Sequence, residues 1–307
     1  MTTVCFIPTG DITNAGSRMR AYWPAQFMPD ATVATWEDIH HGKLPAARAY
    51  VFQKLVDVGL MRRLRDGGAL VFWDVCDPVW WFNPADAREA AEAADGIVAS
   101  CWPLADDFAQ WSGRMARMIP DRVWLDHFTH TRQHAETRPV RLIWFGSAQN
   151  RIALYAAGAS LSRLRANGHE VTLTLFDNAP ESPMPGLDSE IPVYYTRWRL
   201  ENEAETLAAH DIALLPSYPG PWGAVKSNNR TVTAMAAGLP VASGVIYENL
   251  RALVCDVQLR RETAAEGLRE VREEWNVKQS AAEWRALIEE YENGRTSEVR
   301  SAAAVQV

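Results

Sequence analysis

The sequence contains few cysteines, and these stand far apart. Cys5, Cys76, Cys101 and Cys255 are spread over 307 residues and form no C-x-x-C pair. Zinc ribbons and small disulfide frameworks depend on closely spaced cysteines, so this pattern argues against both. We expect free thiols, buried in a core.

Long hydrophobic runs are also missing. No stretch of 18 apolar residues occurs, and the N-terminal "MTTVCFIPTG" has no basic segment followed by a long apolar one. Neither a membrane span nor a secretory signal is indicated, so we expect a cytoplasmic protein.

Positive charge is in deficit. Lysine and arginine number 31 against 38 aspartates and glutamates, which gives a net charge of −7. This balance argues against a protein coated in nucleic acid but leaves room for a local basic groove, for which 62–65 and 114–122 are the arginine-rich candidates. With 48% hydrophobic and 22% charged residues, the composition is that of a soluble globular protein.

Two cofactor signatures are missing as well. No D-x-D motif follows a predicted strand, and Asp74 and Asp77 in "DVCD" have the wrong spacing for one. No G-x-G-x-x-G fingerprint follows the first strand, so a nicotinamide cofactor has little support. We therefore predict no metal site and no cofactor.

The sequence does contain a regular alternation of short apolar runs and amphipathic stretches, in both halves. Such alternation predicts βαβ units around parallel sheets. The polar segment "THTRQHAETRP" at 129–139 is predicted to be a linker. We expect an α/β protein of two tandem doubly wound, Rossmann-like domains that face a cleft. The predicted ranges are 1–128, 140–292 with its terminal helices, and a frayed tail at 293–307.

The stretch "KSNNRTVTAMAAGLPVASG" at 226–244 places two cations at the start of a short helix. Asn228 and Asn229 are good N-caps, and Gly238 suits the position after the helix. Lys226 and Arg230 would converge if the loop continued the helical path. Because the stretch follows the strand "DIALLPS" and helix starts favour anions, the pattern predicts a phosphate site. Solvated surface cations are the alternative.

The order of motifs resembles the donor-binding half of the retaining GT-B glycosyltransferases of the family 4-like group. The resemblance lies in "ENEAETLAAHDIALLPS" and "KSNNRTVTAMAAGLPVAS", and is weaker in "NAGSRMRAY", "VFWDVCDP" and "ADGIVAS". It implies a nucleotide-sugar donor on the C-terminal domain and an acceptor on the N-terminal domain. By matching positions, Lys226 and Arg230 would neutralise the leaving diphosphate without a metal.

This chain departs from the family pattern at one pair of positions. The family usually carries two glutamates separated by a seven-residue gap, where this chain has Val225 and Thr233. The second glutamate grips the donor ribose through its carboxylate, whereas a threonine offers one hydroxyl.

The candidate site residues fall into three groups by expected role. Lys226 and Arg230 are the catalytic candidates, through stabilisation of the leaving diphosphate. The donor-binding candidates are Gly146, Ser147, Arg151, Ser217, Trp222, Ser227, Asn229 and Thr233. The acceptor candidates are Gly16, Ser17, Arg18, Asp74, Asp77, Trp80 and Trp81. A hydrophobic plug is the alternative for the two tryptophans, and solvated linker imidazoles are the reading preferred for His127, His130 and His134.

The leading hypothesis is metal-independent sugar transfer, with retention, from a nucleotide-diphosphate sugar such as a UDP-sugar to a hydroxyl acceptor. A glycan, a small metabolite and a hydroxymethylated DNA base are the acceptors left open. The alternatives are a GT-B-like binding module without donor chemistry, which the threonine at 233 would explain, and a nucleotide-sugar epimerase on the same fold.

Overall fold

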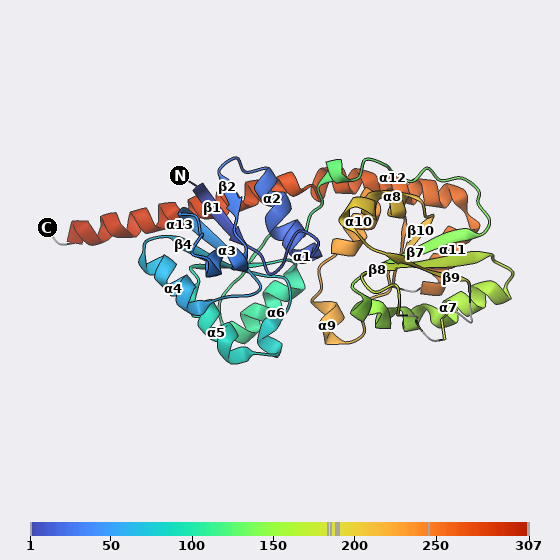
Figure 1. Cartoon of the computed structure of the whole chain (residues 1–307), viewed down its shortest axis with the longest axis horizontal. Coiled ribbons are helices and arrows are strands. Elements are labelled where there is room, and N and C mark those ends of the chain that lie inside the picture. The colour runs from blue at the N-terminus through green and yellow to red at the C-terminus, as the bar shows by residue number, and fades with distance from the viewer. Residues whose placement is uncertain (1, 183, 185, 188–190, 245, 306–307) are drawn as a thin grey trace. The chain divides into compact units, whose positions relative to one another are not determined.

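The computed structural model describes residues 2–182, 184, 186, 187, 191–244 and 246–305, with side chains for those between 3 and 295. Packing divides the chain into two compact units, each of them an α/β layered body (Figure 1). Unit 1 consists of Met1–Arg122, Val225–Ser227 and Val277–Val307. Unit 2 consists of Val123–Ala224 and Asn228–Asn276.

Unit 1 is built on a parallel sheet. Its strand order is β2-β1-β3-β4-β5-β6, and every neighbouring pair runs parallel. The strands are β1 (Thr2–Ile7), β2 (Ala31–Val33), β3 (Ala47–Gln53), β4 (Leu70–Val75), β5 (Gly96–Ala99) and β6 (Arg117–Met118). Their loops at the carboxyl ends therefore lie along one edge of this sheet, the edge where ligands bind in such folds.

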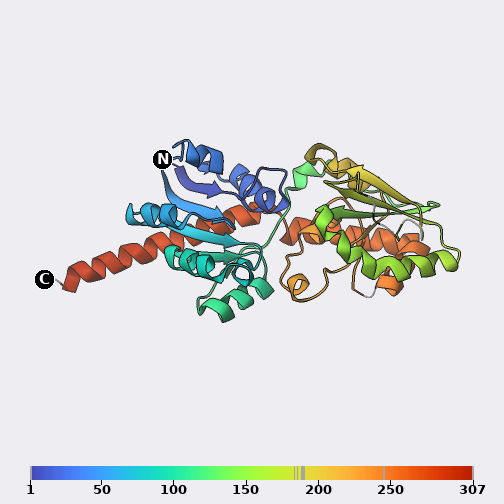
Figure 2. The same cartoon turned by 60° about the horizontal axis from the view of Figure 1, so that its bottom comes forward.

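Both faces of the unit 1 sheet are covered by helices, as Figures 1 and 2 show. Along β1, Cys5 and Ile7 belong to one apolar cluster while Val4 and Phe6 belong to another. The period of two places successive side chains on opposite faces, so a strand buried on both faces reads as a continuous apolar run. One face is covered by α3 (Trp36–His40), α4 (Val58–Asp66), α5 (Pro84–Ala93) and α6 (Trp102–Ser112), and the other by α2 (Trp23–Gln26) and α13 (Val277–Val305).

The terminal helix α13 packs in unit 1 through its apolar stripe. Trp284 is 1% exposed and meets the rings of Phe6 and Phe72 edge-on, with centroids 5.8 and 6.0 Å apart. Edge-to-face packing of buried aromatic rings adds to the free energy gained from burial itself. The sequence-based range placed the terminal helices with the C-terminal domain. That holds for α12 (Val257–Glu274) but not for α13, which continues as helix through the predicted frayed tail to Val305.

The first crossover of unit 1 is helical but irregular. It begins as α1 (Ala15–Ser17), widens to a π-helix, η1 (Arg18–Tyr22), and ends as α2. Asn14 caps its start by accepting from the Ser17 backbone N–H. Single π-turns of this kind occur mostly where a helix re-aims side chains at a functional site. This turn aims Arg20 into the interior, where it is 3% exposed.

Unit 2 is built on a second parallel sheet, of order β11-β10-β7-β8-β9. The strands are β7 (Val140–Gly146), β8 (Val171–Asp177), β9 (Val193–Arg197), β10 (Ile212–Leu214) and β11 (Val241–Ala242). Its helices are α7 (Tyr155–Ala166), α8 (Glu203–Ala208), α9 (Pro221–Ala224), α10 (Asn229–Ala236), α11 (Ile246–Cys255) and α12. Short 3₁₀ turns are η3 (Leu125–His127), η4 (Ala148–Leu154) and η5 (Leu200–Asn202), with η2 (Val79–Trp81) in unit 1.

The segment 129–139, predicted to be a linker, is part of unit 2 and is bonded to other parts of it. Arg132 donates to the buried carboxylate of Asp211 at 2.5 Å, and His134 lies 2.8 Å from the carbonyl oxygen of Gly238. Burial alone would raise the pKa of Asp211, but Arg141 and Arg132 outweigh it and lower that pKa. The unit boundary falls between Arg122 and Val123, before the predicted linker. The polar composition of 129–139 predicted a linker, but its polar groups bind other residues of unit 2.

Within the described ranges, no helix combines the length and the apolar character that crossing a membrane requires.

Candidate functional site

A candidate anion site in unit 2 lies at the start of α10. Arg230 is in the first turn of this helix, and its buried Nη1 has no hydrogen-bond partner among the described residues. Burial lowers the pKa of Arg230. A buried guanidinium nitrogen without a partner leaves a strong donor unsatisfied, which costs stability unless a ligand completes it. The helix start adds its own preference for negative charge.

The carboxyl end of β7 forms the surroundings of Arg230. The guanidinium carbon lies 5.9 Å from the ring centroid of Trp144, whose buried Nε1 also lacks a partner among the described residues. Gly146 ends the strand with a φ of 149°, and a Cβ added there would lie 3.5 Å from the Arg230 Cδ. That distance is an ordinary van der Waals contact, so the positive φ is what favours glycine at this strand end, where the sequence predicted a phosphate contact.

Two further predicted donor residues, Ser147 and Asn229, lie beside these groups in the chain. Ser147 follows Gly146 and is half-buried; its carbonyl accepts from the Asn150 N–H at 2.8 Å. Asn229 is the first residue of α10 and is also half-buried. Their place at a strand end and a helix start suits contact with a phosphate-bearing ligand.

Arg151 is placed differently from the prediction. It is 7% exposed and binds the buried Asp177 carboxylate through Nε and Nη2, at 2.5 and 2.7 Å. It also donates to the carbonyls of Ala179 and Ser182. Its donors therefore hold the loop after β8 in place, and we leave Arg151 out of the proposed donor site.

Thr233 lies on α10, one turn after Asn229. Its hydroxyl donates to the Asn229 carbonyl at 2.8 Å, and the residue is 3% exposed. The hydroxyl proton is thereby used within the helix, and the oxygen can still accept a hydrogen bond. A ribose hydroxyl would find an acceptor there, but not the two oxygens of a glutamate.

The loop "SYPGPWG" at 217–223, which contains Ser217 and Trp222, is tightly folded. Gly220 has a φ of 80°, and a Cβ added at Gly223 would lie 2.0 Å from the Tyr218 carbonyl oxygen. Glycine is therefore required at 223 by close approach of the backbone. Ser217 is exposed and Trp222 half-buried, so the loop presents polar and aromatic groups on a fixed backbone.

Lys226 and Ser227 belong to unit 1, while Arg230 belongs to unit 2. The helix α10 begins at Asn229, so Lys226 precedes it, and the two cations are not one helical turn apart as the sequence suggested. Val225 packs, 6% exposed, in an apolar cluster of unit 1. Ser227 donates to Asp121 at 2.5 Å, and Lys226 donates to Asp77.

Asp77 receives two ammonium groups, one on each carboxylate oxygen. Lys226 donates to Oδ1, and Lys54, at the end of β3, donates to Oδ2 at 2.5 Å. The Asp77 side chain is 12% exposed. The sequence analysis singled out Asp77 and Lys226 but missed Lys54. The rule that ligands bind at the carboxyl ends of strands would have indicated Lys54, since this residue directly follows the strand "AYVFQ".

Asp74, in contrast, is a structural carboxylate. Arg20 binds it through two parallel bonds of 2.5 and 2.7 Å and binds Asp121 at 2.8 Å, with all three side chains at most 3% exposed. Burial alone would lower the pKa of Arg20, but Asp74 and Asp121 outweigh it and raise that pKa. The sequence analysis expected Asp74 to meet an acceptor hydroxyl, but its oxygens are used by Arg20. Neither Arg20 nor Asp121 carries a local signal for this pairing.

Gln53 joins the carboxyl ends of three strands in unit 1. Its side-chain oxygen accepts from the Thr9 N–H at 2.8 Å and from the Ser17 hydroxyl at 3.2 Å. Its amide donates to the Cys76 sulfur at 3.3 Å. A Cβ added at Gly16 would lie 3.2 Å from the Gln53 Nε2. Gly16 and Ser17 thus belong to the predicted edge, and their role is to pack and orient this network.

Arg18 and Trp80 are interior residues rather than ligand contacts. Arg18 is 3% exposed, donates to the carbonyls of Ile12 and Thr13, and lies 5.2 Å from the Trp23 ring centroid. Trp80 is 2% exposed and stacks on Trp111. For Trp80, the plug expected as the alternative is what the structure contains. From the protein interior, both side chains hold in place the loops at the carboxyl edge of the unit 1 sheet.

Exposed apolar side chains follow the carboxyl ends of several strands of unit 1 in the chain. Trp81 is 38% exposed, Phe82 73% and Trp102 60%. Asp107 accepts from the Trp80 and Trp81 indoles at 2.7 and 2.8 Å, which fixes both rings against α6. The exposed set comprises Ile12, Leu55, Trp81, Phe82 and Trp102, which follow β1, β3, β4, β4 and β5 in turn. This edge is therefore aromatic as well as charged.

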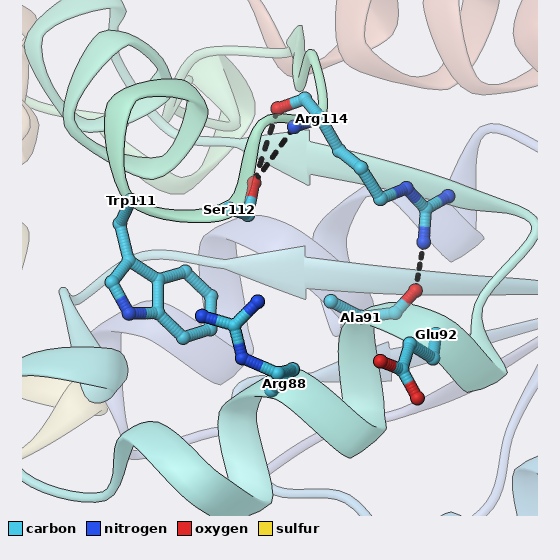
Figure 3. A pocket seen from close by; sticks show the side chains of 6 residues that line it. All are labelled: Arg88, Ala91, Glu92, Trp111, Ser112 and Arg114. Carbon is cyan, nitrogen blue, oxygen red and sulfur yellow. Dashed lines mark hydrogen bonds between the residues drawn. The ribbon is translucent and has the colours of Figure 1, made fainter.

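A hollow of about 230 Å³ in unit 1 lies between α5 and α6 (Figure 3). The Arg88 guanidinium lies 5.2 Å from the Trp111 ring centroid, and Arg114 donates to the Ala91 carbonyl. These are the C-terminal halves of helices that run back from the carboxyl edge, so the hollow lies toward the opposite edge of the sheet. It contains no predicted site residue.

Most arginines of the two segments considered for a DNA groove have partners within unit 1, although Arg62 and Arg117 are exposed. Arg62 pairs with Glu89, Arg65 donates to the Glu92 carbonyl, and Arg114 donates to three backbone carbonyls. Arg117 and Arg122 pair with Glu290 and Glu283. The three ion pairs with glutamates offset part of the positive charge that contact with a phosphate backbone would require.

The histidines near the unit boundary do not form a metal site in the described structure. The His127 Nε2 lies 3.2 Å from a carboxylate oxygen of Glu203, and the His134 ring meets the Gly238 carbonyl. Nowhere in the described ranges do three His, Cys, Asp or Glu side chains gather in a way that could hold a metal ion. Metal independence stays a prediction.

The fold of this chain is similar to the folds of several solved glycosyltransferases. An α-glucosyltransferase in complex with UDP and a 13-mer DNA containing an HMU base matches with a TM-score of 0.69 and 8% identity, over 93% of this chain and 99% of that chain. A glycosyltransferase from Rickettsia africae ESF-5 matches with a TM-score of 0.66 and 6% identity, over 94% and 98% of the two chains.

The DNA-modifying β-glucosyltransferase, studied in the presence and absence of uridine diphosphoglucose, matches with a TM-score of 0.57 and 10% identity, over 94% of this chain and 99% of that chain. No protein-family model and no curated protein matches the sequence. At these identities the likeness defines the fold. The predicted GT-B architecture of two parallel-sheet units is confirmed.

Proposed function

We propose that this protein is a glycosyltransferase that moves a sugar, with retention and without a metal, from a nucleotide-diphosphate sugar such as a UDP-sugar to a hydroxyl acceptor. The observation that carries the proposal is the buried Arg230 Nη1, which lacks a partner among the described residues at the start of α10. A diphosphate oxygen would satisfy this donor, and the positive helix end would add to the attraction.

Sugar transfer is favoured by cations placed beside the leaving diphosphate, which gains negative charge during the reaction. As the bond between sugar and diphosphate breaks, negative charge builds on the diphosphate, and preorganised positive groups lower the barrier. Arg230 and Lys226 are assigned this role, with Gly146, Ser147 and Asn229 as the neighbouring donor contacts. Similar solved structures were obtained with UDP and with uridine diphosphoglucose, which favours a uridine nucleotide here.

The acceptor is assigned to the carboxyl edge of unit 1. Asp77 offers carboxylate oxygens to a hydroxyl, and the exposed Trp81, Phe82 and Trp102 offer flat apolar faces. Such faces pack on the C–H face of a sugar or stack on a base. The solved α-glucosyltransferase bound to DNA makes a hydroxymethylated base in DNA the acceptor to test first, although the paired arginines of unit 1 argue for a small contact area with phosphates.

The proposal is tested by incubating the protein with UDP-glucose and a DNA duplex containing 5-hydroxymethylated pyrimidines, with and without EDTA. The expected result is release of UDP, unaffected by EDTA, and a product whose anomeric proton coupling shows an α-linkage. Hydrolysis of UDP-glucose without transfer would keep the donor assignment and move the acceptor to a glycan or metabolite. Failure to bind any of UDP, GDP and ADP would contradict the proposal and favour a binding module.

A further inference from the structure

Lys54 has an unusual backbone conformation for its residue type. Its φ is 64°, and among the described residues it is the one non-glycine residue with a positive φ. The left-handed region is unfavourable for a residue with a Cβ, and such residues persist where the surroundings enforce them, often at functional sites. A glycine would adopt this conformation without cost.

The backbone of Lys54 is held in this conformation by β4. The Lys54 N–H donates to the Asp74 carbonyl at 2.8 Å, and the Trp73 indole donates to the Lys54 carbonyl at 3.1 Å. Both partners belong to the strand that leads into Asp77. The turn after β3 is therefore fixed relative to the end of β4, and the Lys54 side chain has a fixed direction.

The Lys54 side chain reaches the Asp77 carboxylate, where its Nζ lies 2.5 Å from Oδ2. Burial alone would lower the pKa of Lys54, but Asp77 outweighs it and raises that pKa, so the ammonium is charged at neutral pH. The side chain thus has a specific partner that explains why a lysine, rather than a glycine, occupies this position.

Asp77 also receives Lys226 on its other oxygen. In the proposed function Lys226 binds the leaving diphosphate, so one ammonium has two anionic partners, and the carboxylate competes with the diphosphate for it. With Lys54 on Oδ2, the carboxylate keeps a counter-ion and a fixed position when Lys226 exchanges partners. Without Lys54, Asp77 would have Lys226 as its remaining ammonium, and the competition would strengthen.

We propose that Lys54 is a positioning residue for donor binding and transfer. It holds Asp77 in place while Lys226 exchanges from Asp77 to the donor diphosphate. The exchange leaves Oδ1 of Asp77 able to accept a hydrogen bond from the acceptor hydroxyl. This inference rests on the proposed function. In this proposal Lys54 contacts neither donor nor acceptor. Its role is to control how readily Asp77 releases Lys226.

A double-mutant cycle on nucleotide affinity tests the exchange without knowledge of the acceptor. The probe is whichever of UDP, GDP and ADP binds the wild type most tightly by calorimetry. Lys54→Gly, which also relieves the positive φ, is expected to weaken binding about three- to tenfold. Asp77→Asn removes the competitor and is expected to strengthen binding by a similar factor. In the Asp77→Asn background, Lys54→Gly is expected to change the affinity less than twofold.

Controls separate this role from general charge and from folding. Lys54→Arg keeps the cation and is expected to bind within twofold of the wild type, as is Lys43→Met, which removes an exposed lysine of the same unit. Lys54→Asn tolerates the left-handed conformation and repeats the test if the glycine variant does not fold. An equal loss from Lys54→Gly in both backgrounds, or no loss in either, would overturn the exchange. A wild type that binds none of the three nucleotides would instead overturn the proposed function.

Discussion

Ser227 and Asp121, 106 residues apart along the chain, are joined by a hydrogen bond of 2.5 Å from the serine hydroxyl to the carboxylate Oδ2. Asp121 is also bound by Arg20, and the neighbouring Lys226 is bound by Asp77. The short segment 225–227 is therefore anchored in unit 1 by three successive residues, because Val225 packs in an apolar cluster there.

Ser227→Ala tests this anchor. The variant removes a hydrogen bond to a buried carboxylate, and such bonds to charged groups contribute about 1.5–3 kcal/mol. Because Arg20 still binds the other oxygen of Asp121, we expect a loss near the lower end of that range in the free energy of unfolding, measured by urea denaturation. Ser112→Ala, which removes a hydroxyl bonded to the Arg114 backbone, serves as a control with a smaller loss.

Asp74→Asn is expected to destabilise unit 1 strongly. The substitution leaves the Arg20 guanidinium buried with one carboxylate instead of two, and breaking a buried ion pair costs about 3–5 kcal/mol. Urea denaturation followed by tryptophan fluorescence would report the loss. A variant as stable as the wild type would return Asp74 to the list of candidate ligand contacts.

Trp284→Ala tests the assignment of α13 to unit 1. The side chain is 1% exposed between Phe6 and Phe72, and large-to-small changes of buried tryptophans cost about 3–5 kcal/mol. We expect that loss in the free energy of unfolding. Trp102→Ala is the matched control, because this tryptophan is 60% exposed and its removal should change stability little.

Gly223→Ala is expected to disturb the loop that precedes Lys226. Its Cβ would lie 2.0 Å from the Tyr218 carbonyl oxygen, so the loop backbone must move. We predict weaker nucleotide binding, by roughly tenfold, with little loss of global stability because the loop lies at the surface. At Gly158, in α7, an added Cβ meets nothing within 4 Å, so Gly158→Ala should bind nucleotide normally and gain up to about 1 kcal/mol in stability.

Thiol titration tests the burial of the cysteines: the sequence analysis expected buried thiols, but Cys255 is exposed, and Cys76 and Cys101 are half-buried. Burial raises the pKa of Cys5 to about 11 and that of Cys76 to about 12, so both are protonated and slow to react at pH 8. Cys255 is exposed and should react first with a disulfide reagent. The raised pKa of Cys5 also contributes stability that holds below the pKa of an unfolded thiol and is lost as pH rises toward 11. Unfolding at pH 7.5 and pH 10 should show this loss, and it should shrink in Cys5→Ala.

The sequence patterns predicted the fold well where local periodicity decides it. Uninterrupted apolar strands and amphipathic helices predicted both parallel sheets. Gly238, expected after a short helix, has a φ of 76° just beyond α10. Polarity and proline at 129–139 predicted a linker, but the ion pair of Arg132 with Asp211 joins partners distant in sequence, and this cannot be read from a local pattern.

The site was predicted in part, because residue type does not determine burial. Arg18 and Arg151 look like anion ligands at helix starts, yet the Nη1 of each donates to a backbone carbonyl, and Asp177 binds two further nitrogens of Arg151. Arg230 looked no different in sequence, and its distinction is that its buried Nη1 has no hydrogen-bond partner among the described residues. The place of Lys54 at a strand end could have been read from the sequence, but its positive φ depends on contacts from β4, which the sequence of β3 does not contain.

The most direct measurement is a calorimetric titration of the wild type, Arg230→Ala and Arg251→Ala with UDP. Arg251→Ala removes an exposed arginine of unit 2 and serves as the matched control. We predict that UDP binds the wild type and the control alike and binds Arg230→Ala about ten- to a hundredfold more weakly, as the loss of charge-assisted hydrogen bonds implies. Equal affinity in all three proteins would contradict the assignment of the diphosphate to Arg230.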